Sequence, residues 1–266
     1  MLAIFEKVLY NLLMTIKNLL SFARRAIQDY DMIHEGDRIA VGVSGGKDSL
    51  VLLITLCELR RFLPVHFEVC AIHVDPGFEG STLDESRRIC EAYNIPLHIL
   101  KTQIGQIIFN ERKEKNPCSL CSKMRRGALG REANRLGCNV LALGHHRDDV
   151  VETLLLNLFY AGRIATFEPK SYLDRSDLTL IRPLIYLQEK DILYYCNKNK
   201  ITPDKSGCPA DEKTHREDIK LLIRSLSKEN RDLTSKIFGA ICRANVSTFR
   251  EVQNCLAKST EKPKTE

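Results

Sequence analysis

Five short apolar runs of strand length recur along the chain, and longer segments of helical length separate them. The runs lie at 39–43, 67–74, 97–101, 139–143 and 178–181. Strands that alternate with helices in this way are typical of right-handed β-α-β units, in which the strands run parallel. We therefore predict an α/β fold with a mainly parallel five-stranded sheet and helices on both of its faces.

The remaining segments predict the helices and the domain boundaries. Apolar residues recur with helical periodicity across 2–30, and the longest uncharged run there, 8–16, is far shorter than the ~20 residues of a membrane-spanning helix. The helix expected at 150–160 is apolar on most sides and should be well buried, whereas 161–177 should form a surface loop. We expect an N-terminal helix at 1–35, a central domain at 36–200, a C-terminal helical extension at 201–257 and a disordered tail at 258–266.

Composition narrows the class of protein and its compartment. The chain has 266 residues, of which 44% are hydrophobic and 28% charged, as in an ordinary globular protein with a substantial core. The net charge of +6 and basic clusters such as 123–126 are compatible with a polyanionic partner, although a solvated surface explains any single cluster. Ten cysteines without a secretory segment predict a reducing cytoplasm and no disulfides.

The first strand ends in a turn of small residues at 44–49, with the sequence Ser-Gly-Gly-Lys-Asp-Ser, and a helix follows it. A strand, a glycine turn and a helix together aim free backbone N–H groups and the positive end of a helix dipole at an anion. Lys47 adds a positive charge, and Asp48 is explained if a divalent cation lies among bound phosphates. The alternative is a glycine turn that binds nothing. The turn resembles the PP-loop of ATP pyrophosphatases, which cleave ATP between the α and β phosphates.

A Cys-x-x-Cys pair, Cys118 and Cys121, opens the region before the fourth strand. Such a pair can be a redox dithiol, half of a zinc site or part of an iron–sulfur site. The best third cysteine is Cys208, because it lies in a Gly-Cys-Pro turn and not on an apolar helix face. Three thiolates from two loops suit a 4Fe-4S cluster with one iron that has no protein ligand, and zinc with a fourth non-cysteine ligand is the alternative.

Polar residues also follow the second and fourth strands. Asp75 begins a turn after the second strand, and the run 144–149, Gly-His-His-Arg-Asp-Asp, follows the fourth. Ligands of open α/β sheets gather at the carboxyl ends of the strands. We interpret Asp148 or Asp149 as a magnesium or substrate ligand and the histidines as site-lining, although either aspartate could simply cap the next helix.

These motifs occur in one order that resembles the tRNA 2-thiocytidine synthetase family (TtcA-like) of PP-loop enzymes. The order is the turn 44–49, the cysteine block 117–127, the polar block 143–149, Arg-Pro-Leu at 182–184 and then a single cysteine in a turn. The resemblance covers roughly residues 8–250, and its cysteine and polar blocks are more specific than the PP-loop. It implies that ATP adenylylates the C2 oxygen of a tRNA cytidine, at position 32, and that sulfur then replaces this oxygen.

The motifs and the resemblance together give the expected roles of particular residues. ATP and magnesium would be bound by Ser44, Gly45, Gly46, Lys47, Asp48, Ser49, Asp75, Gly144, His145 and Asp149. The catalytic residues would be Lys47, Asp48, Asp148 and Cys208, and the 4Fe-4S ligands Cys118, Cys121 and Cys208. RNA contacts would come from Lys123, Arg125, Arg126 and Arg147. The implied partners are tRNA, a cysteine desulfurase or other sulfur donor, and a second copy of the chain in a homodimer.

Three departures from the family pattern keep other functions open. The third cysteine stands in Ser-Gly-Cys-Pro at 206–209, the loop after the second strand is compressed, and the chain stops soon after the last helix. The alternatives are a tRNA 2-thiouridine synthetase, an enzyme similar to tRNA lysidine synthetase, which needs no cysteine triad, and a zinc- or nucleotide-binding module.

Overall fold

The computed structural model describes residues 16–112, 117–209 and 215–249, which form parts of two compact units. The first unit combines 1–146 with 170–212, and the second combines 147–169 with 213–266. The beginning of the predicted N-terminal helix, the end of the last predicted helix and the predicted tail at 258–266 lie outside the described residues.

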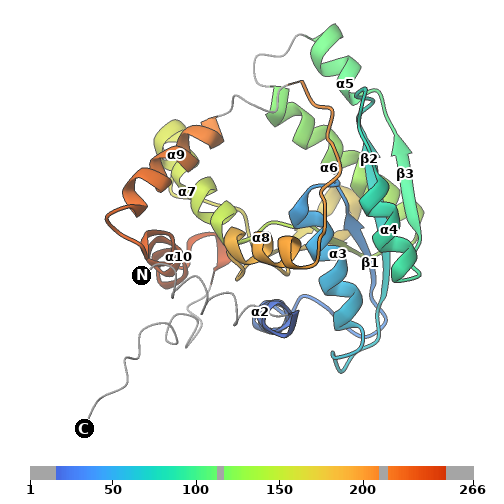
Figure 1. Cartoon of the computed structure of the whole chain (residues 1–266), viewed down its shortest axis with the longest axis horizontal. Coiled ribbons are helices and arrows are strands. Elements are labelled where there is room, and N and C mark those ends of the chain that lie inside the picture. Colours follow the sequence, from blue (N-terminus) through green and yellow to red (C-terminus); the bar gives the residue numbers. More distant parts are fainter. Residues whose placement is uncertain (1–15, 113–116, 210–214, 250–266) are drawn as a thin grey trace. The chain divides into compact units, whose positions relative to one another are not determined.

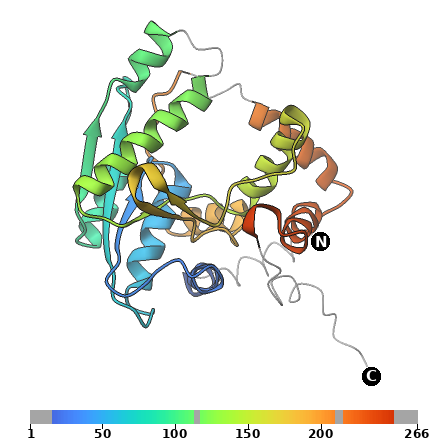
Figure 2. The same cartoon turned by 180° about the vertical axis from the view of Figure 1, so that it is seen from behind.

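The first unit contains a six-stranded sheet with the order β3-β2-β1-β4-β6-β5 (Figures 1 and 2). Five strands pair in parallel, which confirms the predicted mainly parallel sheet: β1 (Arg38–Gly42), β2 (Glu68–Asp75), β3 (Leu97–Lys101), β4 (Val140–Ala142) and β6 (Leu178–Ile181). The sixth, β5 (Lys170–Leu173), pairs antiparallel with β6 at the edge, with Lys170 opposite Ile181. The prediction of a loop throughout 161–177 is therefore wrong, because pairing with β6 orders a segment too short to show a clear apolar pattern.

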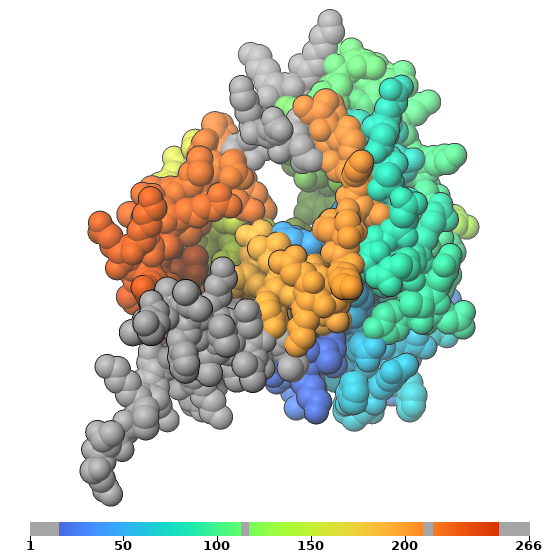
Figure 3. All heavy atoms as spheres, viewed as in Figure 1, coloured from blue at the N-terminus to red at the C-terminus, as the bar shows by residue number. Residues whose placement is uncertain are grey.

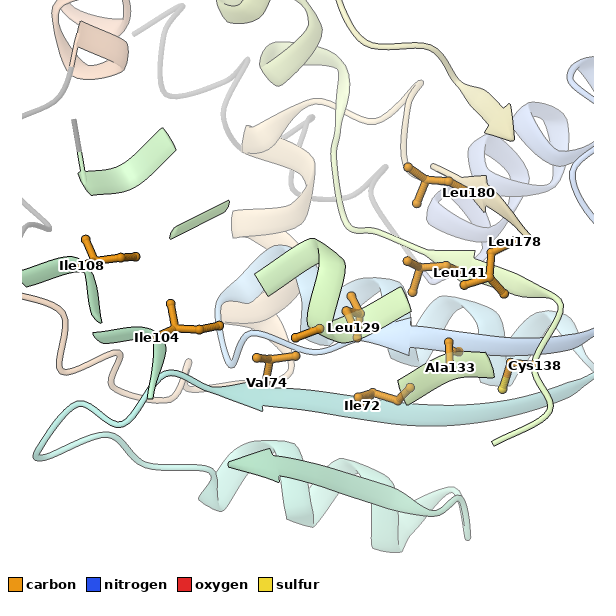
Figure 4. Packing of buried hydrophobic residues seen from close by; sticks show 12 residues of the cluster. Ile72, Val74, Ile104, Ile108, Leu129, Ala133, Cys138, Leu141, Leu178 and Leu180 are labelled. Carbon is orange, nitrogen blue, oxygen red and sulfur yellow. The ribbon is translucent and has the colours of Figure 1, made fainter. Parts of the chain in front are cut away.

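Helices cover both faces of this sheet. The helix α3 (Lys47–Leu59) contacts α2 (Ile16–Asp29), α4 (Asp84–Ala92) and α8 (Glu189–Lys198), whereas α6 (Pro117–Arg135) packs against β2 and β4. Successive side chains of a strand point to opposite faces. Figure 4 shows the core beneath α6, where Leu129 and Ala133 lie over Ile72 of β2 and Leu141 of β4.

Two connections of the first unit contribute residues to the site. Between β3 and α6 the chain forms the short helix α5 (Ile104–Gln106) and the π-helix η1 (Ile107–Glu111), whereas the 3-10 turn η2 (Asp174–Ser176) joins β5 to β6 away from it. After α8, the segment 201–209 has no regular structure and runs along the surface beside the segment that leads into α4 (Figure 3).

The second unit consists of α7 (Arg147–Ala161), α9 (His215–Ser227), α10 (Leu233–Arg243) and the 3-10 turn η3 (Val246–Thr248). The helix α7 contacts both α9 and α10. Its first turns are buried as expected, but Leu158, Phe159 and Tyr160 near its end are 43%, 56% and 54% exposed. The prediction that α7 is well buried is therefore wrong for its last turns. An apolar composition does not reveal how much of a helix its neighbours cover.

None of the described helices is long and apolar enough to span a membrane.

Candidate functional site

The strand order has a topological switch point between β1 and β4. From β1 the chain continues to β2 and β3 on one side, whereas β4 and the later strands lie on the other side. In open α/β sheets, ligands bind outside the carboxyl ends of the strands at such a point. The turn 44–49 follows β1, and Gly144 and His145 follow β4. The sequence therefore places two of its polar motifs on either side of this switch point.

Hydroxyl groups organise the turn 44–49 into a compact loop. The backbone N–H of Ser44 donates to Ser49 Oγ over 3.1 Å, and Ser49 Oγ donates to the carbonyl oxygen of Gly46 over 2.9 Å. The N–H of Gly46 donates to Ser44 Oγ over 3.3 Å. Gly46 is the N-cap of α3, and within the described residues the N–H groups of Lys47 and Asp48 form no hydrogen bond, so these groups and the positive dipole end face the loop.

Lys47 lies between two carboxylates. Its Nζ is 3.1 Å from Asp48 Oδ2 and 3.0 Å from Glu189 Oε1. Burial lowers the pKa of Lys47, but the attraction of Asp48 and Glu189 outweighs it, so the pKa is raised overall and the ammonium stays charged. The sequence analysis did not identify Glu189, because the ion pair joins the beginning of α8 to a loop far away in the sequence.

The carboxylate of Asp48 has one oxygen without a hydrogen bond. Among the described residues, no donor contacts the buried Oδ1, and His146 Nε2 lies 3.6 Å from it. An oxygen in this position can bind a hard divalent cation. Gly144 packs directly on this part of α3, since a Cβ on Gly144 would come within 2.8 Å of the Asp48 carbonyl oxygen. His145 Nδ1 accepts a hydrogen bond from Arg182 Nε over 3.3 Å.

The three predicted cysteine ligands line one cavity in the first unit. Cys118 and Cys121 lie in the first turn of α6, and Cys208 lies on the segment 201–209. The cavity has a volume of about 190 Å³, and its lining includes these three thiols, Ser44 of the turn 44–49 and the guanidinium-bearing Arg125. The structure therefore brings the cysteines together and beside the candidate ATP loop.

The chemistry of the cavity wall favours bound anions. The described residues that line it include Arg125 and Lys205 but no aspartate or glutamate. Burial raises the pKa of the Cys121 thiol, and Arg125 opposes this effect by stabilising the thiolate. The N-terminus of α6 adds a positive dipole end at Cys118 and Cys121.

The segment with Cys208 is held by contacts that the sequence analysis missed. The N–H of Asp204 donates to the carbonyl oxygen of Gly45 over 2.9 Å, and the Asp204 carboxylate accepts hydrogen bonds from the N–H groups of Glu85 and Ser86. Two hydrogen bonds continue the attachment: the N–H of Thr82 donates to the carbonyl oxygen of Lys205, and the N–H of Lys205 donates to Thr82 Oγ1. Asp204 therefore ties together the ATP loop, the beginning of α4 and the third cysteine.

Position 207, next to Cys208, requires glycine because of its backbone conformation and its close neighbours. It has φ +61°, and a Cβ there would lie 2.5 Å from the carbonyl oxygen of Glu79. Any other residue would be strained and would displace the segment.

Asp75 lies at the end of β2, as predicted, and its Oδ1 accepts a hydrogen bond from the N–H of Gly77 over 2.8 Å. The carboxylate thus shapes the turn that leads to Phe78. This contact gives Asp75 a structural role in the turn, and binding of a cofactor by it stays a prediction.

The second unit holds Arg147, Asp148 and Asp149, in the first turn of α7. Asp149 Oδ1 is 3.0 Å from Arg216, whose guanidinium also lies 3.8 Å from Glu152, so Asp149 belongs to an ion-pair network with α9. Asp148 is half-buried. A cofactor contact by either aspartate stays a prediction.

The four predicted RNA-binding residues differ in exposure. Lys123 and Arg126 are exposed on α6, and Arg125 lines the cavity. Arg147 is only 8% exposed, donates to Ser235 Oγ over 3.1 Å and lies over the ring of Phe238. These contacts give Arg147 a structural role between α7 and α10, and RNA binding by it stays a prediction.

The chain is similar to members of one protein family over most of its length. A family model described as a PP-loop domain matches residues 16–225. The tRNA-cytidine(32) 2-sulfurtransferase of Syntrophotalea carbinolica is 41% identical over 220 residues, which cover 82% of this chain and 85% of the relative. The protein of the same name from Geotalea daltonii is 40% identical over 249 residues, covering 92% and 95%.

A solved structure shares the fold as well. The U34-tRNA thiolase NcsA from Methanococcus maripaludis, solved with its 4Fe-4S cluster, matches with a TM-score of 0.71 and 26% identity over 86% of this chain and 78% of that chain.

Proposed function

Because the chain belongs to the PP-loop domain family and, within it, to the tRNA-cytidine(32) 2-sulfurtransferases, we propose that it is an ATP-dependent tRNA sulfurtransferase. Its substrate is a tRNA cytidine, at position 32, whose C2 oxygen it replaces with sulfur. The observation that carries the proposal is the cavity in which Cys118, Cys121 and Cys208 lie beside Ser44 of the PP-loop.

The cavity fits a 4Fe-4S cluster by its donor set. No three histidine, cysteine, aspartate or glutamate side chains of the described residues lie close enough together to hold a single metal ion. The three thiols instead line part of a cavity of about 190 Å³, which suits a larger group, and Arg125 and Lys205 in its wall balance negative charge. We assign Cys118, Cys121 and Cys208 as its ligands. When bound, the cluster supplies an iron without a protein ligand that can carry the incoming sulfur.

The reaction has two steps, and the PP-loop serves the first. The C2 oxygen of the cytidine attacks the α-phosphorus of ATP, the bond to the β-phosphate oxygen breaks, and pyrophosphate leaves. Sulfide sulfur then bonds to C2, and the C2–O bond breaks as AMP departs. The oxygen of a carbonyl is a poor leaving group until it carries AMP, and this is why the enzyme consumes ATP.

The residues of the PP-loop stabilise the charge that develops on pyrophosphate. The free N–H groups at the beginning of α3 and the ammonium of Lys47 bind the phosphates and favour their departure. Asp48 fits a magnesium ligand, because its buried Oδ1 has no hydrogen bond within the described residues. When bound there, magnesium would supply positive charge to the phosphates, and Asp48 would hold it.

Further partners follow from the chemistry. The reaction consumes one sulfur per turnover, so a cysteine desulfurase or another sulfur donor must reload the enzyme. We place the protein in the reducing cytoplasm, where cysteine thiols stay reduced. We also retain the homodimer that the sequence predicts.

The experiment that tests this function is an anaerobic reaction of the cluster-loaded chain with ATP, magnesium, sulfide and tRNA, followed by mass analysis of the nucleosides. We expect 2-thiocytidine, with AMP and pyrophosphate formed in step with it. The likeness to a U34-tRNA thiolase favours a 2-thiouridine product as the second candidate, and the nucleoside mass distinguishes the two. Formation of neither thionucleoside under these conditions contradicts the proposal.

A further inference from the structure

We propose that His73 selects the base to be thiolated, by accepting a hydrogen bond from the exocyclic amine of cytidine. This inference rests on the proposed function and adds a residue that determines its specificity. His73 lies near the end of β2, is 6% exposed, and lines the same cavity as the three cysteines and Ser44. It has no part in the roles described above.

The position of the ring proton follows from one contact. His73 Nδ1 lies 2.9 Å from the carbonyl oxygen of Val43, the residue that precedes the PP-loop. A carbonyl oxygen can only accept, so Nδ1 must carry the proton and donate it. In a neutral imidazole the other nitrogen, Nε2, then has a lone pair and acts as an acceptor.

Nε2 is available to a ligand. No residue that the structure describes forms a hydrogen bond with it, and it is not among the buried polar atoms that are sealed from solvent without a partner. Because Val43 holds the Nδ1 edge of the ring and His73 lines the cavity, we place Nε2 toward the cavity.

His73 is 6% exposed, and such a buried position favours the neutral imidazole over the charged one. A neutral ring with a fixed tautomer offers an acceptor, and it cannot offer a donor at Nε2 without taking up a second proton.

This arrangement distinguishes the two pyrimidines of RNA. Cytosine presents an amino group at C4, which donates hydrogen bonds, whereas uracil presents an oxygen there, which only accepts. Opposite His73 Nε2, cytosine gains a hydrogen bond, but uracil places two acceptors together and leaves both without a partner. Phe78 and Phe109, whose rings form an edge-to-face pair in the same wall, provide an aromatic surface for the base.

The test measures anaerobic thiolation of two tRNA anticodon stem–loops that differ only in cytidine or uridine at the target position. Asparagine at position 73 keeps a donor near the place of Nδ1 but removes Nε2, so H73N should lower the ratio of kcat/KM for cytidine over uridine by about 10- to 100-fold. The change His98→Asn, on the neighbouring strand β3, is the matched control and should leave the ratio unchanged. Bound iron per chain verifies that each variant retains its site.

A second measurement uses the substrate and the unaltered protein. A stem–loop with a pyrimidin-2-one base, which lacks the amine, should be thiolated by the native chain about 10- to 100-fold less efficiently than cytidine, and in H73N this loss should shrink. Two results would overturn the role of His73. One is native-like selectivity in a H73N variant that binds iron, and the other is equal efficiency of the native chain with cytidine and with the pyrimidin-2-one base. Failure of the native chain to thiolate cytidine contradicts the proposed function instead.

Discussion

The backbone N–H of Asp204 donates to the carbonyl oxygen of Gly45 over 2.9 Å, and this bond joins the segment with the third cysteine to the PP-loop. The carboxylate of Asp204 at the same time accepts from Ser86 Oγ and from two backbone N–H groups at the beginning of α4. A helix N-terminus stabilises a carboxylate through these groups and its dipole. One residue thus fixes Cys208 relative to the nucleotide loop.

Replacement of Asp204 by alanine should destabilise the protein and loosen the cysteine site. The lost hydrogen bonds to a charged group predict a decrease of about 2–3 kcal/mol in the free energy of unfolding, measured with denaturant. Asp84→Ala, at an exposed position in the first turn of α4, is the control and should cost less than about 1 kcal/mol. Equal stability of the Asp204 and Asp84 variants would contradict the role of Asp204.

Gly207→Ala should impair cluster binding through the backbone alone. Alanine at φ +61° costs about 1–2 kcal/mol, and its Cβ would meet the Glu79 carbonyl oxygen at 2.5 Å, so the segment next to Cys208 must shift. Gly80→Ala is the matched control, because Gly80 has φ +75° but no atom within 4 Å of the added Cβ. We expect bound iron to fall in the Gly207 variant and to stay near the native level in the Gly80 variant. The reverse order would show that the clash is unimportant.

The buried carboxyl of Asp191 should make the stability of the protein depend on pH. Burial raises the pKa of its carboxyl to about 6, although a hydrogen bond from the N–H of Gln188 acts in the opposite direction. The folded state therefore favours the protonated carboxyl, and a buried charge at Asp191 lowers the stability of the fold. This loss of stability is absent below the unfolded pKa, grows as the pH rises and is complete above about pH 6.

Asparagine at position 191 stays neutral and still offers an oxygen to Gln188. The difference in unfolding free energy between Asp191→Asn and the native chain should therefore rise by up to about 3 kcal/mol from about pH 4 to about pH 7. Denaturant unfolding across this range measures it. A difference that does not vary with pH contradicts the assignment.

The exposed cations of α6 should contribute to tRNA affinity. Lys123→Ala and Arg126→Ala should each weaken binding and lower the slope of log K against log salt concentration by roughly 0.7–0.9, as expected for the loss of one phosphate contact. Arg61→Ala, also at an exposed cation, lies just beyond the end of α3 and should change neither quantity. Filter binding over a series of salt concentrations measures both. Equal effects at all three positions would indicate non-specific attraction.

The sequence was sufficient to predict the parallel sheet and the grouping of the motifs at its edge. Apolar runs such as 39–43 and 178–181 carry a strong local signal, and parallel strands bring the loops that follow them to the same edge. The resemblance to the 2-thiocytidine synthetases, confirmed by relatives of about 40% identity, came from the residue blocks around Cys118 and Gly144.

What the sequence did not reveal depends on contacts between distant segments. Asp204 and Glu85 are 119 residues apart, and no local pattern marks their hydrogen bond. Arg147 stands in a polar run of the sequence, but it is buried and contacts Ser235 and Phe238 of α10, nearly a hundred residues later. The packing of α7 with α9 and α10 in one unit could not be predicted either, because these helices are far apart in the sequence.

The proposed function requires that Cys118, Cys121 and Cys208 together hold an iron–sulfur cluster beside the PP-loop. The most direct measurement is bound iron and visible absorbance after anaerobic reconstitution of Cys208→Ala, with Cys196→Ala as the matched control. Cys196 is buried in α8, and burial raises the pKa of its thiol to about 11, so it should not bind iron. We expect the Cys208 variant to lose the cluster and thiolation together, and the Cys196 variant to keep both. A Cys208 variant with native iron content, absorbance and thiolation would contradict it.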